Sequence, residues 1–148
     1  REHELLIIGE GPERDRLETQ AQILQIDHKV KFLGFRGDAP ELISKAALLL
    51  ITSLREGIPT VILEALYART PFVSTPLPGV AETLSLLPSV PAIITKDSQP
   101  TSLAKAIQTL LGQTTTWPDS LDEKLSAHFS PAAVADHLRR IYREVLAS

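Results

Sequence analysis

Short, mostly apolar runs recur along this chain, and longer segments with helical patterning separate them. Residues 5–8 are four consecutive apolar side chains followed by Gly9, and residues 47–51 form another such run. Runs of this length are typical of strands buried on both faces of a parallel sheet. The pattern predicts strands at residues 5–8, 30–33, 47–51, 72–74 and 92–94.

The segments between these runs have the periodicity of helices. Leu17, Ala21 and Leu24 mark the inner face of the first one, and Ser130 followed by Pro131 predicts the start of the last one. The predicted helices span residues 13–25, 39–45, 59–68, 80–86, 100–111 and 121–128, with a last amphipathic helix from 131 onward. This alternation predicts an α/β fold, a Rossmann-like parallel sheet of about five strands with helices on both faces.

The segment from Ser53 to Ala65 joins the third predicted strand to a helix. It turns at Gly57 and enters the helix with Pro59 in the first turn, where a fixed φ is suitable and the missing N–H is not needed. The start of a helix has free N–H groups and a partial positive charge, so it can hold an anion such as a phosphate. We therefore expect an anion-binding function at this turn.

The helix that follows carries one carboxylate on a mostly apolar surface. On a helical wheel Thr60, Glu64 and Tyr67 share a narrow polar face, and most other positions are apolar. A carboxylate on such a helix is costly to bury unless it faces a cleft or forms hydrogen bonds. Two interpretations stay open: an ordinary stripe facing solvent, or a binding residue at a cleft.

Composition excludes several classes of function. A formal net charge of −3 over 148 residues gives no reason to expect nucleic acid as a partner. The chain contains no apolar run of the roughly 18 residues that a membrane span needs, and its lack of cysteine rules out disulfide and thiol chemistry. The chain also lacks methionine and begins at Arg1, immediately before a predicted strand, so we expect it to be part of a longer protein.

Three other kinds of functional site are not supported, because the sequence lacks residues that each of them needs. Gly9-x-Gly11 is followed by no third glycine of a dinucleotide-binding fingerprint, and no acidic residue ends the next predicted strand. The Gly-x-Ser-x-Gly elbow of a hydrolase is absent from the sequence. The four histidines are scattered without the spacing of metal ligands.

Five motifs follow one another in a specific order. They are Gly-x-Gly-Pro at 9–12, Val-x-Phe-Leu-Gly at 30–34, Ser-x-x-Glu-Gly-x-Pro-x-x-x-x-Glu-Ala at 53–65, Thr-Pro-Phe-Val-x-Thr at 70–75 and Pro-Gly-Val-x-Glu at 78–82. In this order they resemble the nucleotide-sugar-binding half of group 1 (family 4) retaining glycosyltransferases of the GT-B fold. The resemblance covers nearly the whole chain and includes an EX7E motif, with Glu56 and Glu64 as its two glutamates.

The resemblance implies a role for each matching residue. Glu56, the candidate catalytic residue, would bind hydroxyls of the donor sugar, and Glu64 would accept both ribose hydroxyls. The further donor-binding residues that it implies are the backbone of Gly57 and Ile58 at the sugar, the helix start at Pro59, Thr60 and Val61 at the diphosphate, Gly34, Phe35 and Arg36 around the base, Gly9 and Gly11 beside it, and Ser53 and Arg55 at the cleft.

The implied reaction moves a hexosyl unit from a nucleotide sugar to an acceptor hydroxyl with retention of configuration. The expected partners are a nucleoside diphosphate sugar and a glycan, lipid or small-molecule acceptor bound by a separate N-terminal domain. No metal or other cofactor is expected, because the helix start can stabilise charge on the leaving group. We expect a cytoplasmic location, with the inner face of the membrane as a peripheral site for the full-length protein.

Residues 1–148 are expected to be one donor-binding domain, without its first strand–helix unit and its acceptor domain, and inactive alone. Three positions depart from the family pattern: Ala47 replaces a common Asp, Arg69 a usual Gly, and Pro78 the first of two glycines. Pro78 also removes a backbone donor. These departures leave an alternative open, a degenerate, non-catalytic module of the same fold for nucleotide binding or assembly.

Overall fold

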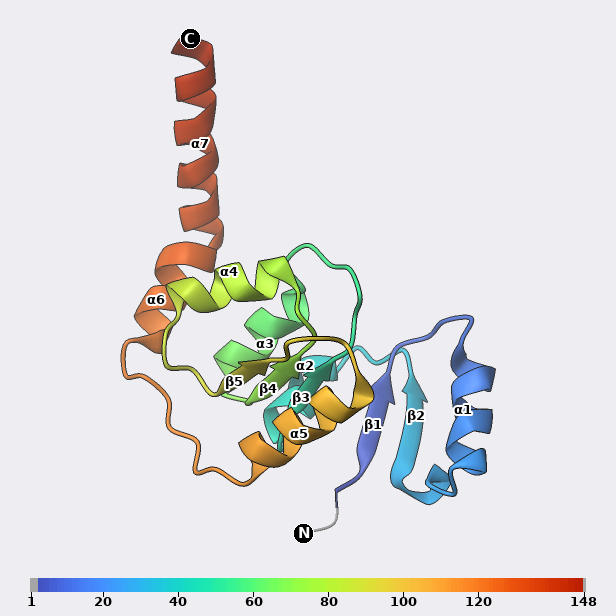
Figure 1. Ribbon diagram of the computed structural model, residues 1–148. Helices are drawn as coiled ribbons and strands as arrows, with labels where there is room; N and C mark the ends of the chain where they lie inside the picture. Colours follow the sequence, from blue (N-terminus) through green and yellow to red (C-terminus); the bar gives the residue numbers. More distant parts are fainter. Residues whose placement is uncertain (1–2, 148) are drawn as a thin grey trace. The chain divides into compact units, whose positions relative to one another are not determined.

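The chain folds into a mixed α/β structure whose strands are all parallel to their neighbours (Figure 1). The computed structural model describes residues 3–147. The chain divides into two compact units, Arg1–Leu42 and Ile43–Ser148, and each is described by itself below. Helix α2 (Ala39–Lys45) contains the boundary.

The first unit contains a two-stranded sheet and one long helix. Its elements are β1 (Leu5–Ile8), α1 (Arg14–Ile23), the short 3₁₀ helix η1 (Asp27–Lys29) and β2 (Val30–Gly34). The backbone N–H of Gly9 donates to the carbonyl of Gly34 at 2.8 Å, and both glycines have positive φ, 119° and 66°. These conformations favour glycine, so the two motifs that end β1 and β2 have a backbone reason for it.

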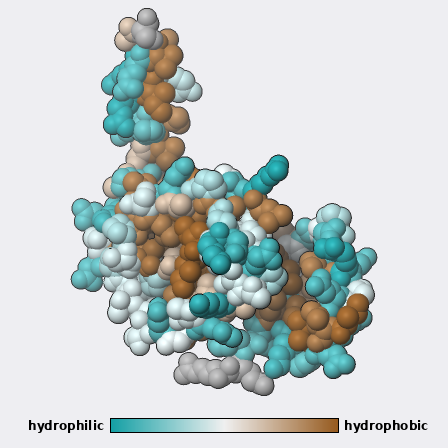
Figure 2. All heavy atoms as spheres, in the orientation of Figure 1, coloured by the Kyte–Doolittle hydropathy of each residue, from teal (hydrophilic) through white to brown (hydrophobic). Residues whose placement is uncertain are grey.

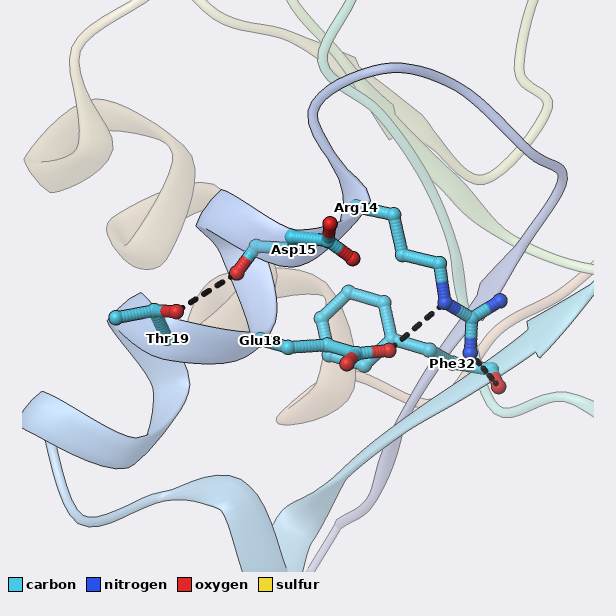
Figure 3. A network of polar contacts seen from close by, with 5 residues as sticks. All are labelled: Arg14, Asp15, Glu18, Thr19 and Phe32. Atoms are coloured by element: carbon cyan, nitrogen blue, oxygen red, sulfur yellow. Dashed lines mark hydrogen bonds and ion pairs between the residues drawn. The ribbon is translucent and has the colours of Figure 1, made fainter.

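Arg14 links helix α1 to strand β2 (Figure 3). Its guanidinium donates to Glu18 at 2.8 Å and to the carbonyl of Phe32 at 3.2 Å, and it lies over the Phe32 ring at 5.9 Å from the centroid. A cation over an aromatic face adds a modest attraction to these hydrogen bonds. One side chain thus fixes the position of the helix on the strand.

The second unit is built on the sheet β3 (Leu49–Ile51), β4 (Phe72–Ser74) and β5 (Ala92–Ile94), in that spatial order. Leu49 lies opposite Phe72, and Phe72 lies opposite Ala92. Since side chains alternate between the two faces of a strand, this register divides the apolar residues into two sets. Two separate cores result, one on each face of the sheet.

Helices cover both faces of this sheet, as the sequence predicts (Figure 1). On one face, α5 (Pro100–Leu111) packs Ala106 and Leu110 against Val73. On the other face, the buried residues come from α2, α3 (Thr60–Ala68), α4 (Pro78–Leu86) and α6 (Leu121–Phe129), around Phe72. The fully buried residues of that face include Ile62, Leu66, Phe72, Val80 and Leu125.

The last helix, α7 (Pro131–Ala147), begins as predicted and is strongly amphipathic. The backbone N–H of Ala133 donates to the Ser130 hydroxyl at 3.2 Å, which confirms Ser130 as the cap. None of the α7 residues that the structure describes is buried, and Figure 2 shows an apolar stripe along the helix. The exposed apolar residues of this stripe are Val134, Leu138, Ile141, Tyr142, Val145 and Leu146.

The structure corrects several details of the sequence-based prediction. Strand β3 begins at Leu49 and helix α4 at Pro78, where residues 47 and 80 were predicted. The strands form one sheet of three and one of two, where a single sheet of five was predicted. Leu5, Leu6 and Ile8 of strand β1 are exposed, where burial on both faces of the sheet was predicted. Helix α1 buries Ala21 but leaves Leu17 and Leu24 exposed, since a two-stranded sheet offers little apolar surface. Pro59 is the N-cap of α3, one residue before the predicted first turn.

Arg69 ends helix α3 in the left-handed region, which explains why glycine is usual there. Its φ is 53°, and its guanidinium pairs with the Asp122 carboxylate at 2.8 Å with both side chains largely exposed. We expect Arg69→Gly to change the free energy of unfolding by less than about 1 kcal/mol, because relief of the backbone cost offsets a weak surface ion pair. Arg69→Val should cost more than Arg69→Gly, since a β-branched residue is poorly suited to positive φ. Urea unfolding of both variants checks this, and equal losses would contradict it.

Asp97 gives helix α5 a pH-dependent contribution to stability. A hydrogen bond from the Ser102 side chain, and a second from the Gln99 backbone at 3.1 Å, lower the pKa of Asp97. A lowered folded-state pKa means that the stabilisation is present above the unfolded value of about 4 and is lost as the pH falls through the folded pKa. We expect Asp97→Ala to be less stable than the wild type at pH 7, with the difference shrinking at pH 3. Urea unfolding at both pH values measures it, and a constant difference would rule it out.

Candidate functional site

The segment between β3 and α3, residues 52–59, leaves the carboxyl end of β3 and is called here the β3–α3 loop. Leu54, Arg55, Glu56, Gly57 and Ile58 are all exposed, and Leu54 is 78% exposed. The Ser53 hydroxyl donates to Oε1 of Glu56 at 3.0 Å, so the carboxylate is oriented from within the loop. Ser53 and Glu56, both predicted site residues, are therefore in direct contact.

The loop ends at the open N-terminus of α3. Pro59 is buried and holds the N-cap position with φ −66° and ψ 117°, and no side chain caps the helix. The first N–H groups of an α-helix have no acceptor inside the helix, and the end carries a partial positive charge. The backbone N–H groups of Thr60 and Val61 are the ones at this end. Within the described residues no side chain caps the start of α3, and anion binding there stays a prediction.

Glu64 lies one turn further along α3 and is half-buried. Thr60 and Tyr67 on the same stripe are exposed, whereas Ile62, Ala65 and Leu66 on the opposite side are completely buried. Within residues 3–147 the Glu64 carboxylate has no hydrogen-bond or ion-pair partner. A partly desolvated carboxylate is stabilised by ligand O–H donors more than a fully hydrated one would be.

Two residues after β4 contact the β3–α3 loop, and the sequence analysis gave neither a role. The Thr75 hydroxyl donates to the Ser53 carbonyl, and the Thr75 N–H donates to the Ile51 carbonyl at 3.0 Å. Gly79, in the first turn of α4, is buried against the Gly57 backbone. Thr75 and Gly79 belong to two of the five sequence motifs, those at residues 70–75 and 78–82, and this was the signal that the sequence offered. The contacts themselves depend on the pairing of β3 with β4.

The predicted residues of the first unit gather at the carboxyl ends of β1 and β2. Gly9 and Gly34 are joined by the hydrogen bond described above, and Gly11 lines a shallow hollow with Arg14. Phe35 is 80% exposed. The role of these residues and of Arg36 at a nucleobase stays a prediction.

Arg36 already has a partner in the first unit. Its guanidinium forms a two-point pair with the Asp38 carboxylate at 2.6 and 2.7 Å. The hydrogen bond and the charge of Asp38 both raise the pKa of Arg36, so the guanidinium stays protonated. Any ligand of Arg36 would therefore meet a side chain that an acidic neighbour has oriented.

Residues 3–147 contain no cluster of three or more His, Cys, Asp or Glu side chains suited to a metal ion. Within the same residues, no helix has both the length and the apolar character that crossing a bilayer requires.

Sequence comparison connects the chain to curated glycosyltransferases. It is 32% identical over 80 residues to N-acetyl-alpha-D-glucosaminyl L-malate synthase of Bacillus anthracis, a match that covers 54% of this chain and 21% of that protein. It is 30% identical over 101 residues to the Vi polysaccharide biosynthesis protein VipC/TviE of Salmonella typhi, covering 68% of this chain and 17% of that protein. The matches thus span only about a fifth of these relatives.

Comparison with solved structures also finds glycosyltransferases. Sucrose-phosphate synthase from Thermosynechococcus elongatus superposes with a TM-score of 0.78 at 25% identity, covering 97% of this chain and 39% of that one. Anabaena Alr3699/HepE in complex with UDP and glucose gives a TM-score of 0.65 at 26% identity, covering 98% of this chain and 40% of that one. These neighbours are GT-B glycosyltransferases.

The family assignment rests on a match that covers most of the sequence. The profile of the family described as "Glycosyl transferases group 1" matches residues 1–133, which is most of the chain. The fold and the curated relatives agree with that match. The chain belongs to the glycosyl transferases group 1 family.

Proposed function

We propose that the chain binds the nucleoside diphosphate sugar donor of a retaining glycosyltransferase. The observation that carries the proposal is the arrangement around the start of α3, where an oriented, exposed Glu56 and a half-buried Glu64 flank open backbone N–H groups. This arrangement combines groups for an anion with groups for sugar hydroxyls. A nucleotide sugar has both kinds of feature next to each other.

The diphosphate belongs at the N-terminus of α3 in this proposal. The N–H groups of Thr60 and Val61 would donate to phosphate oxygens, and the helix dipole adds to the attraction. In glycosyl transfer the leaving group is the nucleoside diphosphate, and negative charge develops on it as the sugar bond breaks. Donors fixed in advance at that point stabilise the transition state without reorganisation. We propose that donor binding here does not depend on a metal ion.

The two carboxylates suit the two diols of the donor. Glu64 would accept hydrogen bonds from both ribose hydroxyls, and Glu56 from hydroxyls of the sugar. Charge-assisted hydrogen bonds of this kind are stronger than neutral ones. The Ser53 hydroxyl already occupies one oxygen of Glu56, which leaves its other oxygen for the ligand.

Gly57 supports a close approach of the ligand to the loop. A Cβ built at Gly57 meets no atom of the described chain within 4 Å, and the backbone there is not left-handed. The protein's own packing therefore does not require glycine at this position. A sugar lying directly against the Gly57 backbone would require it.

The comparisons are consistent with this proposal at a coarser level. A solved neighbour, Anabaena Alr3699/HepE, is in complex with UDP and glucose, and a Campylobacter jejuni relative is named for transfer of N-acetyl-D-galactosamine to an undecaprenol-linked acceptor. Since the chain spans a small part of its relatives, we propose that transfer takes place when this donor-binding part closes on an acceptor-binding part. The chain alone would then bind donor without transferring it. The cytoplasmic, peripheral location stays a prediction.

Glu64→Gln tests the central contact. Glutamine keeps the shape of the side chain but loses the charge, so affinity for the nucleotide should fall by about 10- to 100-fold, the worth of hydrogen bonds to a charged group. Isothermal titration with UDP, GDP and ADP and with their glucose conjugates, with and without EDTA, measures it. Glu144→Gln, the same change on exposed α7, should leave affinity unchanged. Absence of binding, also by a longer chain that includes the expected upstream strand–helix unit, would instead favour a non-catalytic assembly module.

Gly57→Ala separates ligand approach from protein packing. Because the position is open and unstrained, alanine should leave the free energy of unfolding unchanged or raise it by up to about 1 kcal/mol. The added methyl should nevertheless weaken binding of UDP-glucose more than binding of UDP. Thermal unfolding and titration of the same preparation check both parts. A stable variant with unchanged preference for UDP-glucose would show that no sugar lies against this backbone.

A further inference from the structure

The β3–α3 loop depends on other parts of the unit for its shape. Residues 52–58 form no backbone–backbone hydrogen bond within the described part of the chain, and most of them are exposed. A segment with exposed residues and few hydrogen bonds of its own is expected to open locally at low cost. Glu56 is nevertheless held in one orientation by Ser53 in the same loop. Something outside the loop must fix both residues.

Gly79 makes the closest of these outside contacts. It is buried in the first turn of α4, after the N-cap Leu77 and Pro78. A Cβ built there would overlap the carbonyl oxygen of Gly57, and it would lie 2.8 Å from the Gly57 carbonyl carbon and 3.1 Å from the Ile58 Cα. The peptide between Gly57 and Ile58 therefore packs directly against the Cα of Gly79. Only glycine allows this approach.

Thr75 holds the other end of the loop. Its hydroxyl donates to the Ser53 carbonyl and its backbone N–H donates to the Ile51 carbonyl at 3.0 Å. Thr75 is 1% exposed, so these bonds are shielded from water. Thr75, directly after β4, thus holds Ser53, and Gly79, in the first turn of α4, packs against Gly57. Glu56 lies between these two contacted residues.

We infer that Gly79, together with Thr75, is a positioning residue that sets the place of Glu56 through the β3–α3 loop. The inference rests on the proposed function for its consequence in binding, because Glu56 is the group proposed to hold the sugar. Gly79 itself needs no contact with the donor. Because Gly79 has no side chain, the Gly57 backbone can occupy the space that a Cβ at position 79 would fill.

Gly79→Ala tests this by amide NMR without any ligand. Because the added methyl cannot coexist with the Gly57 carbonyl, signals of residues 53–58 should shift while those of α5 stay in place. Gly112→Ala is the matched control, since Gly112 ends α5 with φ −84° and its added Cβ would lie 3.2 Å from the Gln108 carbonyl oxygen. A folded Gly79→Ala variant with unmoved signals for residues 53–58 overturns the inference.

Thr75 provides a second test should Gly79→Ala fail to fold. Thr75→Val removes the hydroxyl and keeps the branched shape, so the signals of residues 53–58 should shift. Thr75→Ser retains the hydroxyl and should restore them. If valine and serine shift these signals equally, the effect comes from packing and the proposed hold on Ser53 is wrong.

Titration with UDP and UDP-glucose measures the consequence for binding. We expect Gly79→Ala to lower the affinity for UDP-glucose by about tenfold relative to UDP, the worth of one charge-assisted hydrogen bond. An unchanged ratio in a variant whose loop has moved overturns the inference. If the wild-type chain binds neither of these probes nor the GDP and ADP compounds titrated above, the proposed function fails, and the NMR comparison still decides whether Gly79 holds the loop.

Discussion

The parallel register of β3 with β4 is the constraint on which the rest of the second unit depends. Leu49 opposite Phe72 and Ile51 opposite Ser74 make both strands end at the same level. The segments that leave these ends therefore lie next to each other, which is the usual place for ligands in open parallel sheets. A shift of one residue would exchange the two apolar faces and separate Thr75 from Ser53.

Groups that attract anions and groups that repel them therefore lie close together at the start of α3. The start of α3 favours anions, whereas Glu56 and Glu64 repel them and accept hydrogen bonds from hydroxyl groups. A ligand that presents phosphates to the helix start and hydroxyls to the carboxylates satisfies both. A simple anion would meet the repulsion without the hydroxyl contacts. Under the proposed function, this difference would make the site prefer sugar nucleotides over free phosphate.

The three departures from the family pattern are accommodated by the fold. Arg69 accepts a left-handed conformation and pairs with Asp122 on α6. Pro78 occupies the first position of α4, where its fixed φ is suitable and an N–H would have no acceptor inside the helix. Ala47 is exposed and lies two residues before the start of β3. None of the three disrupts the elements that carry Glu56 and Glu64.

The sequence by itself determined the order and type of the elements and the family. Apolar runs and caps act over a few residues, so β4, β5, α2 and α5 were predicted with the observed bounds, and Ser130 was identified as a cap. Helix η1, the division into sheets of two and three strands, and the exposed face of α7 were not predicted. Only the tertiary structure decided which strand pairs with which. It thereby also decided the contacts of Thr75 with Ser53 and of Gly79 with Gly57. The physical reason is that these contacts join residues more than twenty positions apart, and no local pattern encodes such a distance.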